Sequence, residues 1–171
     1  MTIFYKIISE SEALFSLKDG EIIKSTHNTQ NSYNLPRNFF KYVTENNILN
    51  KDPYIKYKRK HIDDDAYILQ KDYEFKLGST VLLLIGDEYD NSENEFIASL
   101  NGTNNKFQIY RTVYGDLGWQ YSWFVELYDK NLSGNKLILD IDEINKVFTI
   151  DIEFTSINQN SYLEFIENFE F

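Results

Sequence analysis

The stretch 135–154, NKLILDIDEINKVFTIDIEF, constrains the fold most, because it holds two runs of strict alternation around a short polar break. A period of two predicts strands with one buried face. A four-residue loop, Glu143–Lys146, pairs Ile141 with Phe148 and brings every apolar side chain to one side, whereas a loop one residue shorter would not. The apolar positions of that side are Leu137, Leu139, Ile141, Phe148, Ile150, Ile152 and Phe154.

The opposite face of this predicted hairpin is polar. The same register sets Lys136 opposite Glu153 and gathers three aspartates with no cation among them. We therefore expect the hairpin to bury one side and to present carboxylates on the other. The three aspartates are Asp140, Asp142 and Asp151.

Length and composition predict one domain over 1–171 that can bury a core without cross-links. The chain has no cysteine, which excludes disulfides and thiolate metal sites. The start, MTIFYKIISES, has too short an apolar run for a signal-peptide core, and no stretch approaches the length of a membrane span. We expect a cytoplasmic protein that does not engage a membrane.

The formal net charge is −10, and the acidic excess lies in the second half of the chain. Residues 1–85 hold twelve Lys and Arg against eleven Asp and Glu, and residues 86–171 hold five against sixteen. A surface of one sign steers oppositely charged molecules, so this half predicts a basic partner and argues against nucleic acid there. The alternative is that the charge only keeps a bacterial or phage protein in solution.

Local signals predict the first elements. Thr2–Ile8 is expected to form a strand, and Asp19-Gly20 predicts a hairpin between Ala13–Leu17 and Glu21–Lys24. A competing interpretation starts a short helix at Ser9, with Glu12 completing a capping box and Gly20 as the C-cap. A helix is expected over 36–46, because Pro36 suits a first turn and an apolar stripe follows. The stripe is Phe39, Phe40 and Val43.

The rest of the chain favours strands and a final helix. Thr80–Ile85, TVLLLI, fits a central strand buried on both faces. At the C-terminus, Ser161 and Glu164 predict a capping box before an aromatic helical stripe. We predict an α+β fold, predominantly antiparallel sheet (meander or hairpins), with one helix near 36–46 and a C-terminal amphipathic helix. Further strands are expected at Tyr54–Lys60, Ala66–Leu69, Tyr73–Leu77, Phe96–Leu100, Phe107–Tyr114 and Tyr121–Tyr128, and the stripe is Tyr162, Phe165, Ile166 and Phe169.

Two groups of residues have a pattern that chemistry can use. His61 with Asp63, Asp64 and Asp65 offers an imidazole and hard oxygens to a divalent metal, and the run 56–60 offers lysines to phosphate. Together they make a metal-dependent phosphodiesterase or nuclease the second hypothesis. The simpler interpretations are a polar loop that joins two strands and the charged face of an edge strand.

Three large aromatic residues, Trp119, Tyr121 and Trp123, alternate and are expected to share one strand face. If exposed, they would form a sugar-stacking platform, which makes a carbohydrate-binding module the third hypothesis. Buried, they would be core, since Trp and Tyr dominate both kinds of environment.

The first hypothesis is a small acidic binding protein, of the inhibitor or immunity type, that neutralises a basic nucleic-acid-processing or toxin protein. The chain shows no nucleophile with its base, no phosphate-binding loop and no cofactor motif, so no enzyme activity, cofactor or metal is expected. Carboxylates can occupy a cationic site on the partner. The expected partner-binding residues are Asp87, Glu88, Asp90, Asp140, Asp142 and Asp151.

Overall fold

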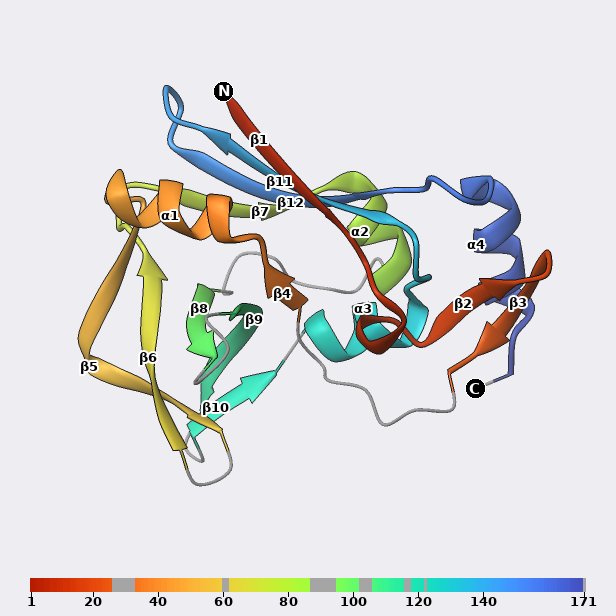
Figure 1. Cartoon of the computed structure of the whole chain (residues 1–171), viewed down its shortest axis with the longest axis horizontal. Helices are drawn as coiled ribbons and strands as arrows, with labels where there is room; N and C mark the ends of the chain where they lie inside the picture. The colour runs from red at the N-terminus through yellow and green to blue at the C-terminus, as the bar shows by residue number, and fades with distance from the viewer. Residues whose placement is uncertain are drawn as a thin grey trace.

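The structure is a computed structural model, and it describes residues 1–25, 33–59, 62–86, 95–101, 106–115, 118–121 and 123–170. Short helices separate runs of consecutive strands along the chain (Figure 1). Their bounds are β1 Thr2–Ile7, η1 Glu10–Glu12, β2 Phe15–Lys18, β3 Glu21–Lys24, β4 Tyr33–Leu35, α1 Arg37–Glu45, β5 Leu49–Arg59, β6 Ile62–Leu69, β7 Glu74–Leu77, α2 Ser79–Ile85, β8 Glu95–Asn101, β9 Lys106–Gly115, β10 Gly118–Tyr121, α3 Trp123–Lys130, β11 Lys136–Asp142, β12 Val147–Glu153 and α4 Gln159–Asn168.

The described strands form three sheets. The first has the order β1-β11-β12-β7, and we call it the hairpin sheet. The second has the order β10-β9-β8-β6-β5, with β4 paired to β9, and the third is the β2–β3 hairpin. Every pairing is antiparallel except that of β12 with β7. The predicted α+β class with predominantly antiparallel sheet is confirmed.

The organising hairpin has the register that the sequence predicts. Ile141 pairs with Phe148, Leu139 with Ile150 and Leu137 with Ile152, so the apolar residues share one face. These side chains are all buried, whereas the alternate positions are partly or fully exposed. Alternation fixes this register because a slip by one residue would turn the whole apolar set to solvent.

The buried face of the hairpin sheet packs onto the second sheet and α1, and Phe148 lies at the junction. Its ring centroid is 4.8 Å from that of Phe96 in β8, 5.6 Å from Phe75 in β7 and 5.7 Å from Phe39 in α1. Figure 1 shows the hairpin sheet and α1 above the strands of the second sheet. On the opposite face, the alternate side chains of β1 are exposed when the described residues are considered.

Of the two interpretations of residues 9–24, the hairpin is confirmed, whereas a helix from Ser9 to a C-cap at Gly20 is wrong beyond its first turn. Ser9 and Glu12 make the capping box of the short 3-10 helix η1. The β2–β3 hairpin follows, with Asp19 at φ 52° and Gly20 at φ 80° in its turn. Positive φ at both positions is what a two-residue type I′ turn requires.

Both predicted helices are present, with one boundary different from the prediction. α1 begins directly after Pro36 and buries Phe39, Phe40 and Val43. α4 begins two residues before Ser161, and the Asn158 side chain caps it by accepting from the amides of Asn160 and Ser161. The Ser161–Glu164 capping box is thus wrong, because Asn158 supplies the acceptor one turn earlier.

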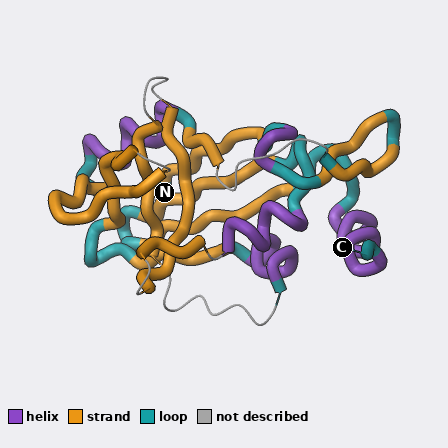
Figure 2. Tube along the Cα trace, turned by 90° about the horizontal axis from the view of Figure 1, so that it is seen from below, coloured by secondary structure: helices purple, strands orange, loops and turns teal. Residues whose placement is uncertain are grey.

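The aromatic stripe of α4 packs against the β2–β3 hairpin. Phe15 lies 5.6 Å from Phe165 and 5.0 Å from Phe169, both edge to face. Tyr162 is buried, and its hydroxyl donates to the Lys130 carbonyl at 2.7 Å. Figure 2 shows α4 beside this hairpin at the end of the molecule away from most strands.

The prediction of a central strand at Thr80–Ile85 is wrong, since these residues belong to helix α2. Val81, Leu84 and Ile85 are buried at helical spacing, while the Leu83 side chain is 54% exposed. A short apolar run has no polar positions to reveal its period, so alternation could not separate a strand from a helix.

The strand predicted at Tyr121–Tyr128 is also wrong beyond its first residue. β10 ends at Tyr121, and helix α3 begins at Trp123 and buries Leu127. The aromatic content of the segment favours a strand by propensity, and tertiary packing of Leu127 against the core overrides that preference.

Candidate functional site

The face of the hairpin sheet that points away from the core is the candidate site, and we call it the outer face. It carries a row of apolar side chains along the edge strand β1, of which Ile3 is 54%, Tyr5 60% and Ile7 52% exposed. Soluble proteins seldom expose such rows without a binding role. The remaining outer-face positions are Lys136, Ile138, Asp140 and Asp142 of β11 and Val147, Thr149, Asp151 and Glu153 of β12.

A cleft of about 810 Å³ lies on the outer face. Its floor is formed by β1, β11 and β12, and the segment that leads from β12 into α4 forms one wall. Ile3, Tyr5 and Ile138 give it apolar surface, and Asp140, Asp151 and Glu153 give it carboxylates. The single Lys136 leaves the ionisable lining with an excess of negative charge.

Asp151 is held by α2. Its Oδ1 accepts from the backbone amides of Thr80 and Val81, both at 3.2 Å. These amides belong to the first turn of the helix, where backbone donors have no partner within the helix. Asp151 therefore caps a helix from a neighbouring strand, and only part of its carboxylate faces the cleft.

Asp142 is held by the hairpin turn. Its Oδ1 accepts from the amides of Ile144 and Asn145 at 3.1 and 3.0 Å, and its Oδ2 from the Asn145 side chain at 2.8 Å. The hydrogen bond from the Asn145 amide is the main cause that lowers the pKa of Asp142. Asp142 thus stabilises the turn through hydrogen bonds to the backbone that follows it, as aspartate often does.

The expectation that no cation lies among the carboxylates is wrong at the turn end of the hairpin. The N-terminal ammonium of Met1 lies 3.2 Å from Oε2 of Glu143, and its charge acts on Asp140 and Asp142 as well. The prediction considered side chains alone, whereas β1 pairs with β11 and brings the chain terminus to the turn.

Asp140 differs from the other two aspartates. Its Oδ1 is buried and has no hydrogen-bond partner among the described residues. Burial, and then the charge of Asp142, raises the pKa of the Asp140 carboxyl. Its neighbours across the strands are Ile3 and Thr149. An acceptor that is desolvated without a bond is costly, so a cation at this position would be favoured.

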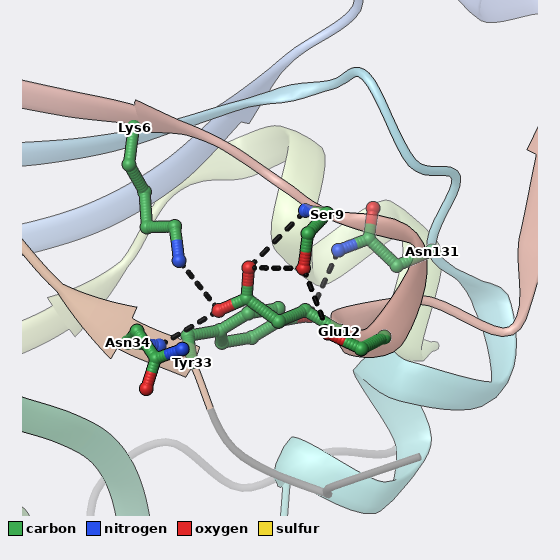
Figure 3. A network of polar contacts seen from close by, with 7 residues as sticks. Lys6, Ser9, Glu12, Tyr33, Asn34 and Asn131 are labelled. Carbon is green, nitrogen blue, oxygen red and sulfur yellow. Dashed lines mark hydrogen bonds and ion pairs between the residues drawn. The ribbon is translucent and has the colours of Figure 1, made fainter. Parts of the chain in front are cut away.

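A second polar cluster surrounds Glu12, and Figure 3 shows hydrogen bonds to both oxygens of its carboxylate. Lys6 Nζ lies 2.5 Å from Oε2, and the Asn34 amide donates to the same oxygen at 2.7 Å. The amide and hydroxyl of Ser9 donate to Oε1 at 3.1 and 2.8 Å. Glu12 therefore joins β1, η1 and β4, and its role is structural.

Asp87, Glu88 and Asp90, which the sequence predicts in a loop, and also His61 lie outside the described residues, so their proposed roles stay predictions. Asp63–Asp65 belong to β6 and not to a polar loop. The β5–β6 register sets Lys56 opposite Asp65 and Lys58 opposite Asp63. The prediction of a loop was wrong because the strand β6 begins directly after His61.

The three aromatics do not share one strand face. Trp119 and Tyr121 lie on β10, at the edge of the second sheet, while Trp123 is the first residue of α3. The alternation from which the shared face was predicted ends with β10, because the backbone turns helical there.

Within the described residues, no three His, Asp or Glu side chains are grouped so that they could hold a metal ion. In the same part of the chain, no helix has both the length and the apolar character to cross a membrane. Comparison of the sequence with protein-family models and curated proteins, and of the fold with solved structures, gave no match.

Sequence reasoning missed the apolar row on β1. The alternation Ile3, Tyr5, Ile7 was visible, but its exposure depends on β1 lying at the edge of the hairpin sheet among the described strands. Strand order is set by packing between distant segments, so alternation alone does not reveal it.

Proposed function

We propose that this chain is a binding protein of the inhibitor or immunity type, which neutralises a basic toxin or nucleic-acid-processing protein by docking its outer face on it. The observation that carries the proposal is the cleft, which joins exposed apolar side chains to an excess of carboxylates. A cytoplasmic site of action, in a bacterial or phage setting, is part of the same proposal.

The composition of the cleft suits a segment with both apolar and cationic side chains. Tyr5 and Ile138 offer contact area, and Tyr and similar residues often dominate binding energy. The Lys136 ammonium lies 4.6 Å from the centre of the Tyr5 ring, so this ring already accepts a cation. A second cation, from the partner, would be attracted by the negative charge of Asp140, which lines the cleft.

Asp142 and Asp151 support the site more than they contact a partner, since their oxygens already accept hydrogen bonds within the chain. They still add negative charge to the field of the outer face. Asp87, Glu88 and Asp90 follow α2, whose Thr80 lines the cleft, and we propose that they extend the same acidic surface.

Affinity capture from the native host at low salt tests the proposal, with three immobilised baits. Wild type and Glu167→Lys should each retain one stoichiometric basic protein that elutes as salt rises, because Glu167 is exposed on α4 outside the cleft lining. Asp140→Lys adds the same charge inside the cleft and should lose that protein. Equal retention on all three baits would contradict docking on the outer face.

A further inference from the structure

Strand β1 lies at the edge of the hairpin sheet, and its outer side can accept a further strand. In the hairpin sheet β1 pairs only with β11 among the described strands. The amide of Ile8, just past β1, donates to the Asn135 carbonyl at 2.9 Å. Ile8 therefore belongs to the set of alternate residues whose backbone groups hydrogen-bond to the β11 side. By the alternation of an antiparallel pair, the backbone groups of Ile3, Tyr5 and Ile7 point away from β11. None of these groups has a hydrogen-bond partner among the described residues.

This edge lacks the usual protection of edge strands. Natural sheets guard their edges with outward charges, prolines or bulges. The lysine of β1, Lys6, turns inward and pairs with Glu12, and the outward side chains are Ile3, Tyr5 and Ile7, each more than half exposed. The strand therefore offers unpaired backbone groups beside an apolar row.

The apolar row of one copy can pair with the same row of a second copy. It has the same sequence, Ile-Tyr-Ile, from either end, so an antiparallel copy centred on Tyr5 sets Ile3 against Ile7 of the second copy. The flanking charges agree with this direction. On β11, Asp140 is opposite Ile3 and Lys136 is opposite Ile7. The two-fold axis therefore sets Asp140 of one copy and Lys136 of the other on the same side of the axis, three strand spacings or about 14 Å apart.

We propose that β1 pairs antiparallel with β1 of a second copy about a two-fold axis at Tyr5, so that two hairpin sheets join into one. Such an interface is isologous, the commonest kind in homo-oligomers. The net charge of −10 on each chain opposes association, and salt screens it. Dimerisation should therefore strengthen as salt rises, opposite to the binding of a basic partner.

Sedimentation velocity of the full chain at 20 and 300 mM salt tests the dimer, with two variants of equal added charge. Tyr5→Lys places two cations face to face at the axis and should leave a monomer in both conditions. Ile144→Lys changes an apolar residue, 86% exposed, in the β11–β12 turn and should dimerise like wild type. Both variants are first shown to be folded by their thermal melts. A wild type that stays monomeric at several hundred micromolar in 300 mM salt would overturn the proposal.

The register has its own test, because the chain has no cysteine. In a directly opposed pair the Cα atoms are about 5.5 Å apart, within the range that a disulfide spans. In a glutathione redox buffer, Tyr5→Cys should form a symmetric disulfide dimer. Ile3→Cys alone should not, while a mixture of Ile3→Cys with Ile7→Cys should. Cross-linking of Ile3→Cys alone as readily as Tyr5→Cys would refute the pairing about Tyr5, whether or not a basic partner binds.

Discussion

Oδ1 of Asp151 lies 3.2 Å from the backbone nitrogens of both Thr80 and Val81, so a strand carboxylate caps a helix 70 residues earlier in the chain. Gly78 permits this approach, since a Cβ at that position would lie 2.1 Å from Cγ of Asp151. Asp151 thus joins the hairpin sheet to α2, so the residue that adds charge to the cleft also stabilises the fold.

Asp151→Ala should therefore destabilise the fold by about 1 kcal/mol, within the range for loss of a helix cap. Glu153→Ala is the matched control, because this exposed carboxylate lies on the same strand and the same outer face. Urea unfolding measures both. Equal stabilities for the two variants would show that the bonds to α2 contribute nothing.

The packing of α4 gives a graded prediction. Phe15→Ala should cost about 3–5 kcal/mol, because the ring is fully buried and contacts Phe165 and Phe169. Phe165→Ala should cost less, since that ring is only partly buried. Glu167→Gln should be neutral or slightly stabilising, because it removes an acid near the negative end of the helix. The melting temperatures rank the three variants. A Phe165→Ala variant that melts like wild type would mean that α4 does not depend on the contact with Phe15.

Asp140→Asn should raise stability at pH 7 by about 1 kcal/mol or less, because it removes a charge that burial opposes. The pKa of Asp140 is raised in the folded state, so the folded protein takes up this proton before the unfolded one. The advantage of the variant should then shrink as the pH falls toward the raised pKa. Chemical denaturation at pH 7 and pH 4.5 tests this, and a variant less stable than wild type at pH 7 would contradict it.

The pKa of Glu143 is shifted in the opposite direction to that of Asp140. The Thr2 hydroxyl first, and then the N-terminal ammonium and the Tyr42 hydroxyl, lower the pKa of Glu143 to about 2 from 4.5. A lowered pKa contributes stability that is complete above pH 4.5 and is lost as the pH falls toward 2. Glu143→Gln should be less stable than wild type at neutral pH and equal to it near pH 2. If the two free energies of unfolding keep a constant difference through this window, the contacts of Glu143 are not formed.

The hairpin over 135–154 could be predicted in register from the sequence because apolar residues occupy every second position of both strands on one face. Helix α2 could not. TVLLLI has a single polar residue, Thr80 at its start, which is too little to mark a period, and the carboxylate that caps the helix comes from Asp151 on another element. Helix α3 was missed in the same way, because burial of Leu127 depends on segments far away in the sequence.

The candidate site could be predicted only in part. The outer face and its three aspartates follow from the hairpin. The contacts that distinguish Asp140, Asp142 and Asp151 from one another come from α2, the turn and the chain terminus. The apolar row of β1 depends on strand order, which local patterns do not contain.

The salt dependence of association with the captured basic protein tests the central claim most directly. For wild type, the association rate constant should fall steeply from 20 to 300 mM salt while dissociation changes less, because long-range steering acts on encounter. Asp140→Asn combined with Glu153→Gln should lower the association rate at low salt, and so should the loop variant Asp87→Asn, Glu88→Gln, Asp90→Asn if those acids share the surface. Rates that stay the same across salt and in both variants would show that the acidic surface does not dock the partner.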